Sequence, residues 1–277
     1  MSTEAEEFRN RKLPSFGECI YCGTPATEAK LTDEHIIPFS LGGTAILLKA
    51  SCACCAKITS KLELHLARTI FGHHRIHANV ATRNPKERPS VLPTTIKVGE
   101  NPAQEMELPI ADHPYFTLLP VWKAPGMLTG APPTADFGTE ELHRFEFVPA
   151  HFRELLSLNE NDILNFEIPI KLDLNQFSRA LAKIAYCMAI CRYGLKGFER
   201  TTITEFVRGK YPFAPFLVGS TTKAVAPPMP NIDHAIGLTE FPVAGRNTVI
   251  AFVRLFAKTG TTTQGMPYYT VVIGARL

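Results

Sequence analysis

Residues 19–55 read CIYCGTPATEAKLTDEHIIPFSLGGTAILLKASCACC. Two Cys-x-x-Cys pairs bound this stretch, Cys19 with Cys22 and Cys52 with Cys55. A tight turn in each pair brings two sulfur atoms within reach of one metal ion, and two pairs supply the four thiolates of a tetrahedral zinc site. The pattern therefore predicts a structural zinc ion bound by these four cysteines.

Three further cysteines complete the seven of the chain. Cys54 is an alternative ligand, but the two-residue spacing favours its neighbours, so we expect Cys54 to be a small buried residue. Cys187 and Cys191 lie four residues apart in an apolar helical segment, and we expect both in the core rather than at a metal.

The composition is that of an ordinary globular protein, with 45% hydrophobic and 20% charged residues among 277. This length suits one large domain or two modest ones. The apolar run 180–190 is interrupted by Lys183 and is shorter than the roughly 20 residues that cross a bilayer, so we expect no membrane span. The acidic N-terminus does not resemble a secretory signal, which predicts a cytoplasmic protein without disulfides.

The residues around the cysteine pairs predict two strands and a helix. Residues 31–43 form a strand-like run that ends at a Gly-Gly turn, as in a hairpin. Residues 56–71 carry apolar side chains at every fourth position, which indicates a helix that ends at Gly72. These side chains are Ile58, Leu62, Leu66 and Ile70.

The order of four short motifs resembles the zinc-stabilised HNH endonucleases. The motifs are Cys19-Ile-Tyr-Cys22, Asp33-Glu-His-Ile-Ile-Pro38, Leu41-Gly-Gly43 and Cys52-x-x-Cys55. The resemblance covers about the first quarter of the chain and implies a treble-clef-like ββα-metal fold. In that family a histidine at the end of the first strand activates water against a phosphodiester, and His35 matches this position. Glu34 would ligate a catalytic Mg²⁺ or Mn²⁺ ion, with Asp33 as the alternative carboxylate.

His35 suits the role of general base, since a neutral imidazole with a pKa near 6.5 accepts a proton at cellular pH. Adjacent strand residues point to opposite faces, so Glu34 and His35 share one site only if the strand ends or bends there.

The chain departs from the family pattern in two places. Ala56 and Ser60 stand where family members carry a further Asn or His ligand, and Glu63 is either a compensating ligand or a surface carboxylate. The family's middle Asn is absent from residues 45–50, where a backbone or Lys49 contact is the expected substitute. These departures motivate an alternative function, a zinc-stabilised nucleic-acid-binding or adaptor protein that does not cleave.

The net charge of +3 and the pI near 8.4 give little support for an anionic partner by themselves. The prediction of a nucleic-acid-binding surface therefore depends on local clusters of basic residues. The candidates for phosphate contact are Lys57, Arg75, Arg83, Lys86 and Arg88. A solvated loop is the alternative for the basic stretch. The neighbouring segment His73-His-Arg-Ile-His77 offers either a second metal site or imidazoles that face phosphate or solvent.

Residues 90–277 carry no second catalytic signature. Strand-like segments at 94–98 and 116–122, a helix at 174–193 stopped by Gly194, and an antiparallel hairpin of 248–256 with 268–273 predict an α+β accessory domain. We expect this domain to position substrate, recognise a protein partner or mediate homo-oligomerisation.

The sequence as a whole predicts an α+β protein with an HNH nuclease domain at residues 1–89 and the accessory domain at 90–277. The predicted function is metal-dependent hydrolysis of phosphodiester bonds in DNA, in a bacterial or phage setting such as defence.

Overall fold

The computed structural model describes residues 9–138, 141–159, 161–167, 172–221, 234–256 and 267–277. Its N-terminal part contains the predicted hairpin and helix. Strands β2 (Leu31–His35) and β3 (Ile46–Cys52) pair antiparallel, β1 (Lys12–Leu13) adds a parallel strand to β3, and α2 (Ala53–His65) follows at once. A short 3-10 helix, η1 (Phe39–Leu41), lies in the connection and ends at Gly42, whose φ of 92° suits glycine.

The predicted helix of residues 56–71 corresponds to α2 and the π-helical turn that follows it, and it ends just before Gly72 as predicted, but Gly72 begins a new helix that was not predicted. A π-helical turn, η2 (Leu66–Ile70), leads to Phe71, and Gly72 is the first residue of α3 (Gly72–His77). Phe71 is buried and its ring centroid lies 5.0 Å from that of Phe256. The chain therefore changes direction where a large aromatic side chain enters the core, and Gly72 continues into a new helix.

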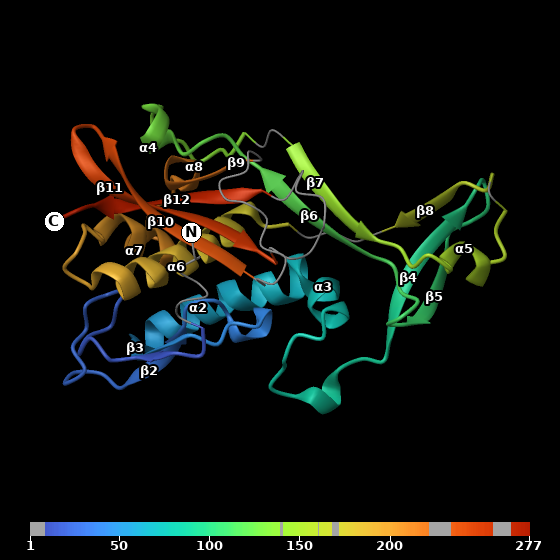
Figure 1. The fold of residues 1–277 in the computed structure, drawn as a ribbon, viewed down its shortest axis with the longest axis horizontal. Coiled ribbons are helices and arrows are strands. Elements are labelled where there is room, and N and C mark those ends of the chain that lie inside the picture. The colour runs from blue at the N-terminus through green and yellow to red at the C-terminus, as the bar shows by residue number, and fades with distance from the viewer. Residues whose placement is uncertain (1–8, 139–140, 160, 168–171, 222–233, 257–266) are drawn as a thin grey trace.

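A small lobe stands at the end of the molecule away from the N-terminal strands (Figure 1). It follows η3 (Pro85–Glu87) and consists of β4 (Val91–Val98), β5 (Gln104–Pro109), β8 (Leu164–Glu167) and α5 (Phe152–Leu155), with sheet order β5-β4-β8. Phe152 packs with Ile96 and Leu108 in a cluster separate from the main core. The antiparallel pair β6 (Tyr115–Val121) and β7 (Glu141–Phe147) leads back to the body.

The C-terminal part is a four-stranded antiparallel sheet covered by helices. The strands are β9 (Val218–Thr221), β10 (His234–Val243), β11 (Arg246–Leu255) and β12 (Tyr268–Ala275), in the order β10-β11-β12-β9. The shorter helices are α4 (Gly126–Thr129), α7 (Thr201–Val207) and α8 (Ala214–Leu217). The predicted C-terminal hairpin strands are confirmed, and the connection between them at 257–266 lies outside the described residues.

Helix α6 (Leu174–Tyr193) lies between this sheet and α2 (Figure 1). Its N-cap is Asp173, whose carboxylate accepts a hydrogen bond from the Gln176 backbone N–H at 3.0 Å, and it ends at Gly194, as predicted. Nearly every residue from 177 to 190 is buried, because one side faces the sheet and another faces the N-terminal unit.

One hydrophobic core therefore runs through both the N-terminal unit and the C-terminal sheet. It includes Leu62 and Leu66 of the helical segment, Ile184 of α6 and Val253 of β11. The fold is α+β, as expected, while a domain boundary near residue 89 stays a prediction. No helix within the described ranges is long and apolar enough to cross a membrane.

Candidate zinc centre and active site

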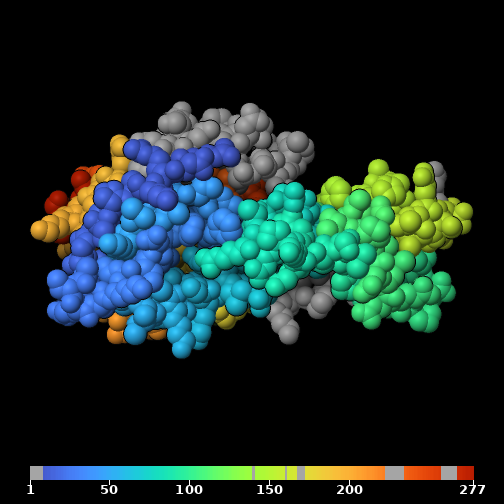
Figure 2. Space-filling model, turned by 90° about the horizontal axis from the view of Figure 1, so that it is seen from below, coloured from blue at the N-terminus to red at the C-terminus, as the bar shows by residue number. Residues whose placement is uncertain are grey.

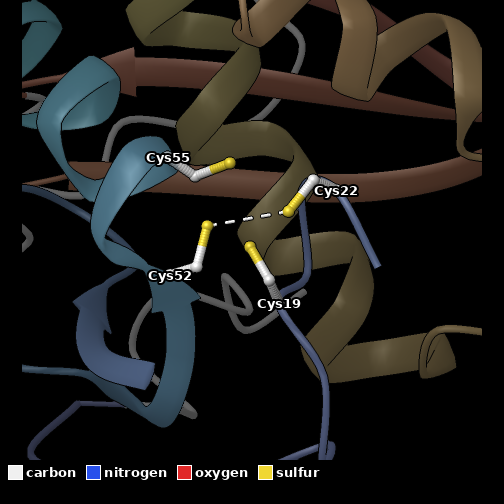
Figure 3. Close-up of side chains that lie close together, drawn as sticks. All are labelled: Cys19, Cys22, Cys52 and Cys55. Carbon is white, nitrogen blue, oxygen red and sulfur yellow. Dashed lines mark hydrogen bonds between the residues drawn. The ribbon is translucent and has the colours of Figure 1, made fainter. Parts of the chain in front are cut away.

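The four predicted cysteines converge on one point (Figure 3). Their sulfur atoms all lie within 4.8 Å of one another, and the Sγ atoms of Cys22 and Cys52 are 3.6 Å apart. Four sulfur ligands in a tetrahedral cluster are typical of a structural zinc site. The donor set therefore fits the zinc ion that the sequence predicts.

Local backbone geometry places the sulfur atoms of both pairs. In the first pair, Gly23 has a φ of 75° and its N–H donates to the Cys19 carbonyl at 2.8 Å, which closes the turn. In the second pair, Cys52 ends β3 and Cys55 lies in the first turn of α2. The positive end of the α2 dipole favours the thiolates that bind a metal.

The protonation of the cluster is uneven. A hydrogen bond with the Cys55 side chain lowers the pKa of Cys19 to about 4, and the same contact raises the pKa of Cys55. The cluster thus stabilises a thiolate at Cys19 even before a cation contributes its charge.

The other three cysteines lie outside this cluster. Cys54 is exposed, so the prediction that it is buried is wrong: Cys52 and Cys55 share the side of the helix end that faces the cluster, and Cys54 points elsewhere. Cys187 is fully buried, as predicted, with its Sγ 3.4 Å from the Tyr21 hydroxyl, and Cys191 is half-buried.

Asp33 lies where the pairing of β2 with β3 shifts register. Its Oδ1 accepts a hydrogen bond from the backbone N–H of Lys49 at 2.9 Å, and Lys49 has a left-handed φ of 46°. This backbone contact braces the hairpin in the region where the family's middle Asn is absent. Asp33 thus has a structural partner in β3.

Glu34 points into the protein, with 5% of its surface exposed. One carboxylate oxygen lies 2.9 Å from the Nζ atom of Lys183 on α6, and the other accepts a hydrogen bond from the Thr59 hydroxyl on α2 at 3.4 Å. Both oxygens of the predicted metal ligand therefore have partners within the protein.

Lys183 is the centre of this buried polar group, with 1% of its side chain exposed. Its Nζ atom also lies 2.7 Å from Glu63 Oε1, and it donates to the backbone carbonyl of His35. Burial acts to lower the pKa of Lys183, but the charges of Glu34 and Glu63 outweigh it and raise the pKa. Lys183 is therefore an ammonium ion that neutralises part of the charge of two carboxylates.

His35 ends β2 and is half-buried, with its ring centroid 5.8 Å from that of Phe39. Burial lowers the pKa of His35, and the positive charges of Lys183 and Arg83 lower it further, while Glu63 acts to raise it. The imidazole is thus neutral at neutral pH, as a general base requires.

Strand β2 ends at His35, as a common site would require, but the contact that the structure gives is made by the His35 backbone, so a site shared by Glu34 and the His35 imidazole stays a prediction. The Glu34 side chain faces inward, and the carbonyl of His35 binds the same Lys183 ammonium that binds Glu34. Sequence reasoning missed Lys183 and Thr59 as members of this group. The available signal was the single charge of Lys183 within the apolar run 180–190.

The predicted basic residues divide into two groups. Arg75 donates to the Ser40 carbonyl at 3.0 Å, and Arg88 donates to Asn79 and to the Val80 carbonyl, so both have roles in the fold. The exposed members are Lys57, Arg83 and Lys86. The segment that follows α3, in teal, lies on the surface between the N-terminal unit and the small lobe (Figure 2). Phosphate contact by these residues stays a prediction.

The histidines after α2 meet a partner that the sequence did not suggest. His77 Nε2 lies 3.3 Å from Nδ1 of His113, and His113 Nε2 lies 3.2 Å from the Pro93 carbonyl. The His73 ring packs against the same His113 ring at 5.0 Å. Within the part of the chain that the structure describes, only the four cysteines bring three or more metal-ligating atoms close enough for one ion. The structure thus gives no support for a second metal site here.

We expect this histidine group to make folding sensitive to acid. Burial lowers the pKa of His73 and His113 and, together with the charges of neighbouring histidines, lowers that of His77 to about 4. In the unfolded chain these histidines bind protons near pH 6.5, whereas in the folded protein they do so only at lower pH. Protonation therefore favours the unfolded state once the pH falls below 6.5. Stability is therefore retained above pH 6.5 and falls toward pH 4.

Urea unfolding of wild type and of His77→Gln at pH 7.5 and pH 5 measures the contribution of His77. The loss of stability on acidification should be smaller in His77→Gln. His151→Gln should keep nearly the wild-type loss, because His151 is exposed and its ion pair with Asp112 lies at the surface, where such pairs contribute little. An equal loss in all three proteins would contradict the role of His77.

Strands β2 and β3 and helix α2 form a small domain of the kind that a structural zinc ion stabilises. Four cysteines form its metal site, and His35 lies at the end of β2. Residues 19–71 match the family model described as HNH endonuclease, and this part of the chain is an HNH-type domain. No curated protein and no solved structure matches the chain.

Proposed function

We propose that this protein is an endonuclease that hydrolyses phosphodiester bonds in DNA, with His35 as general base. The observation that carries the proposal is the neutral, half-buried imidazole at the end of β2, inside a domain that matches the HNH endonucleases. In this mechanism, His35 accepts a proton from the attacking water. Arg83 and Lys57, both exposed, attract the phosphate backbone.

The carboxylates that were expected to bind a catalytic divalent ion already have partners within the protein, so such an ion does not fit this site. Asp33 accepts from the Lys49 amide, and Glu34 and Glu63 bind the Lys183 ammonium. We therefore assign no catalytic step to Mg²⁺ or Mn²⁺ at this place. Zinc at the four cysteines supports the fold that presents His35.

Plasmid nicking by zinc-loaded protein, with and without Mg²⁺ or Mn²⁺, tests the proposal. General base catalysis is typically worth about 10²- to 10⁴-fold, so His35→Ala should lose at least about 100-fold in cleavage rate. Because burial lowers the pKa of His35, wild-type cleavage should rise with pH through a value below 6.5.

His151→Ala is the matched control, since His151 is exposed and lies in the small lobe. It should cleave like wild type. Unchanged cleavage by His35→Ala would remove the assigned role of His35.

The second candidate function is a zinc-stabilised nucleic-acid-binding or adaptor protein without cleavage. Two observations favour it: Ala56 replaces the expected ligand after the last cysteine, and Lys183 binds both carboxylates that would hold a catalytic ion. Salt-sensitive DNA binding by wild type, without nicking under any metal condition, would support this function over the endonuclease.

A further inference from the structure

Three elements that are far apart in the sequence meet at one buried cation. Glu34 comes from β2, Glu63 from α2 and Lys183 from α6. The Lys183 Nζ atom lies 2.9 Å from a Glu34 oxygen and 2.7 Å from a Glu63 oxygen, and its side chain is 1% exposed. The ammonium thus sits between the two carboxylates inside the protein.

Two carboxylates that converge on one point commonly hold a divalent ion. Here the protein itself supplies the positive charge. The three N–H groups of the ammonium are matched by Glu34, Glu63 and the His35 carbonyl, with the Ile36 carbonyl at 3.4 Å as a further acceptor. The hydrogen bonds of the ammonium are therefore satisfied without water or a ligand.

We propose that Lys183 is a built-in cation that takes the place of a divalent metal ion between Glu34 and Glu63. It is a positioning residue: it offsets part of the charge of the two carboxylates and binds the carbonyl of His35, so that helix α6 of the C-terminal part holds the strand end that carries the imidazole. The inference rests on the proposed function in that it concerns the same centre.

Displacement of Lys183 by a metal ion is opposed by its surroundings. Helix α6 packs against the C-terminal sheet and against α2, and residues 181, 182 and 184–187 around Lys183 are all fully buried. An ammonium displaced from the two carboxylates would lose its partners while its side chain, 1% exposed, stays inside the protein, and a buried unpaired charge is costly. The carboxylate pair should therefore bind Lys183 in preference to an added ion.

Mn²⁺ binding to the zinc-loaded full chain, followed by electron paramagnetic resonance, tests this inference without any cleavage assay. Whatever Mn²⁺ binding wild type shows elsewhere on its surface should have the same affinity in Glu63→Gln within about twofold, because Glu63 does not bind Mn²⁺ while Lys183 is present. Lys183→Met should gain one Mn²⁺ site, bound at least about tenfold more tightly than any wild-type site at the carboxylates, where tenfold corresponds to 1.4 kcal/mol. Lys183→Met/Glu34→Gln should lose that site again.

Two outcomes would overturn the inference. One is a wild-type Mn²⁺ site that weakens tenfold or more in Glu63→Gln. The other is a Lys183→Met protein that is folded by circular dichroism but gains no site. If Lys183→Met does not fold, the comparison of wild type with Glu63→Gln still decides the question. If wild type does not cleave DNA, the endonuclease proposal fails, but these Mn²⁺-binding results still test the role of Lys183.

Discussion

Replacement of two zinc ligands, as in Cys19→Ser/Cys55→Ser, should remove the bound zinc and unfold the N-terminal unit. The unit consists of short strands and one helix, and the cysteines join its first turn to the start of α2. The apparent free energy of zinc binding in zinc-finger peptides is about 10–16 kcal/mol, which is as large as the stability of a whole domain. This is the largest effect that we expect from any substitution in the chain.

Metal content by plasma mass spectrometry and thermal unfolding by circular dichroism measure this effect. Wild type should hold one zinc ion per chain, and the double variant should hold none and should unfold at a clearly lower temperature. Cys54→Ser is the matched control, because Cys54 is exposed and lies between two ligands. A double variant that keeps its zinc and its melting temperature would rule out this metal centre.

Lys183→Met should lower the free energy of unfolding by about 3–5 kcal/mol, the usual cost of removing one partner from a buried ion pair. The variant leaves Glu34, which is 5% exposed, without a positive charge. Glu63 is 26% exposed and should recover part of its hydration. Most of the loss therefore comes from Glu34.

Urea unfolding of the zinc-loaded protein measures the loss. Lys183→Met/Glu34→Gln should recover part of it, because a neutral amide replaces the unpaired carboxylate. Lys61→Met is the control: Lys61 is exposed on α2, and its replacement should change stability by no more than about 0.5 kcal/mol. Equal stabilities of Lys183→Met and Lys61→Met would show that the buried ion pair does not stabilise the fold.

Features with a local pattern were predictable from the sequence. The two Cys-x-x-Cys pairs predicted the four-cysteine cluster, because each pair requires only a tight turn or a helix end. The helix at 174–193 followed from its continuous apolar pattern and from Gly194 after it. The paired C-terminal strands followed from their β-branched and aromatic residues.

Features that depend on packing between segments far apart in the sequence were not predictable. Gly72 follows the end of the predicted helix, but the new helix that it begins, α3, was not predicted, and Phe71 at the junction packs against Phe256, which directly follows the distant strand β11. His113 joined the histidines of α3 only because β4 and β6 bring it there. No periodicity in the sequence marks such pairs.

The candidate active site shows the same division most clearly. The sequence by itself determined the zinc cysteines, since they depend on a few neighbouring residues, and the resemblance to the HNH endonucleases predicted that His35 ends a strand. Only the tertiary structure decided what Glu34 and Glu63 bind. Their partner, Lys183, lies 120 residues from Glu63 along the chain, and the two meet because α6 packs against α2 in one continuous core. A charge inside an apolar helix indicates that a partner exists, but packing alone determines which residue it is.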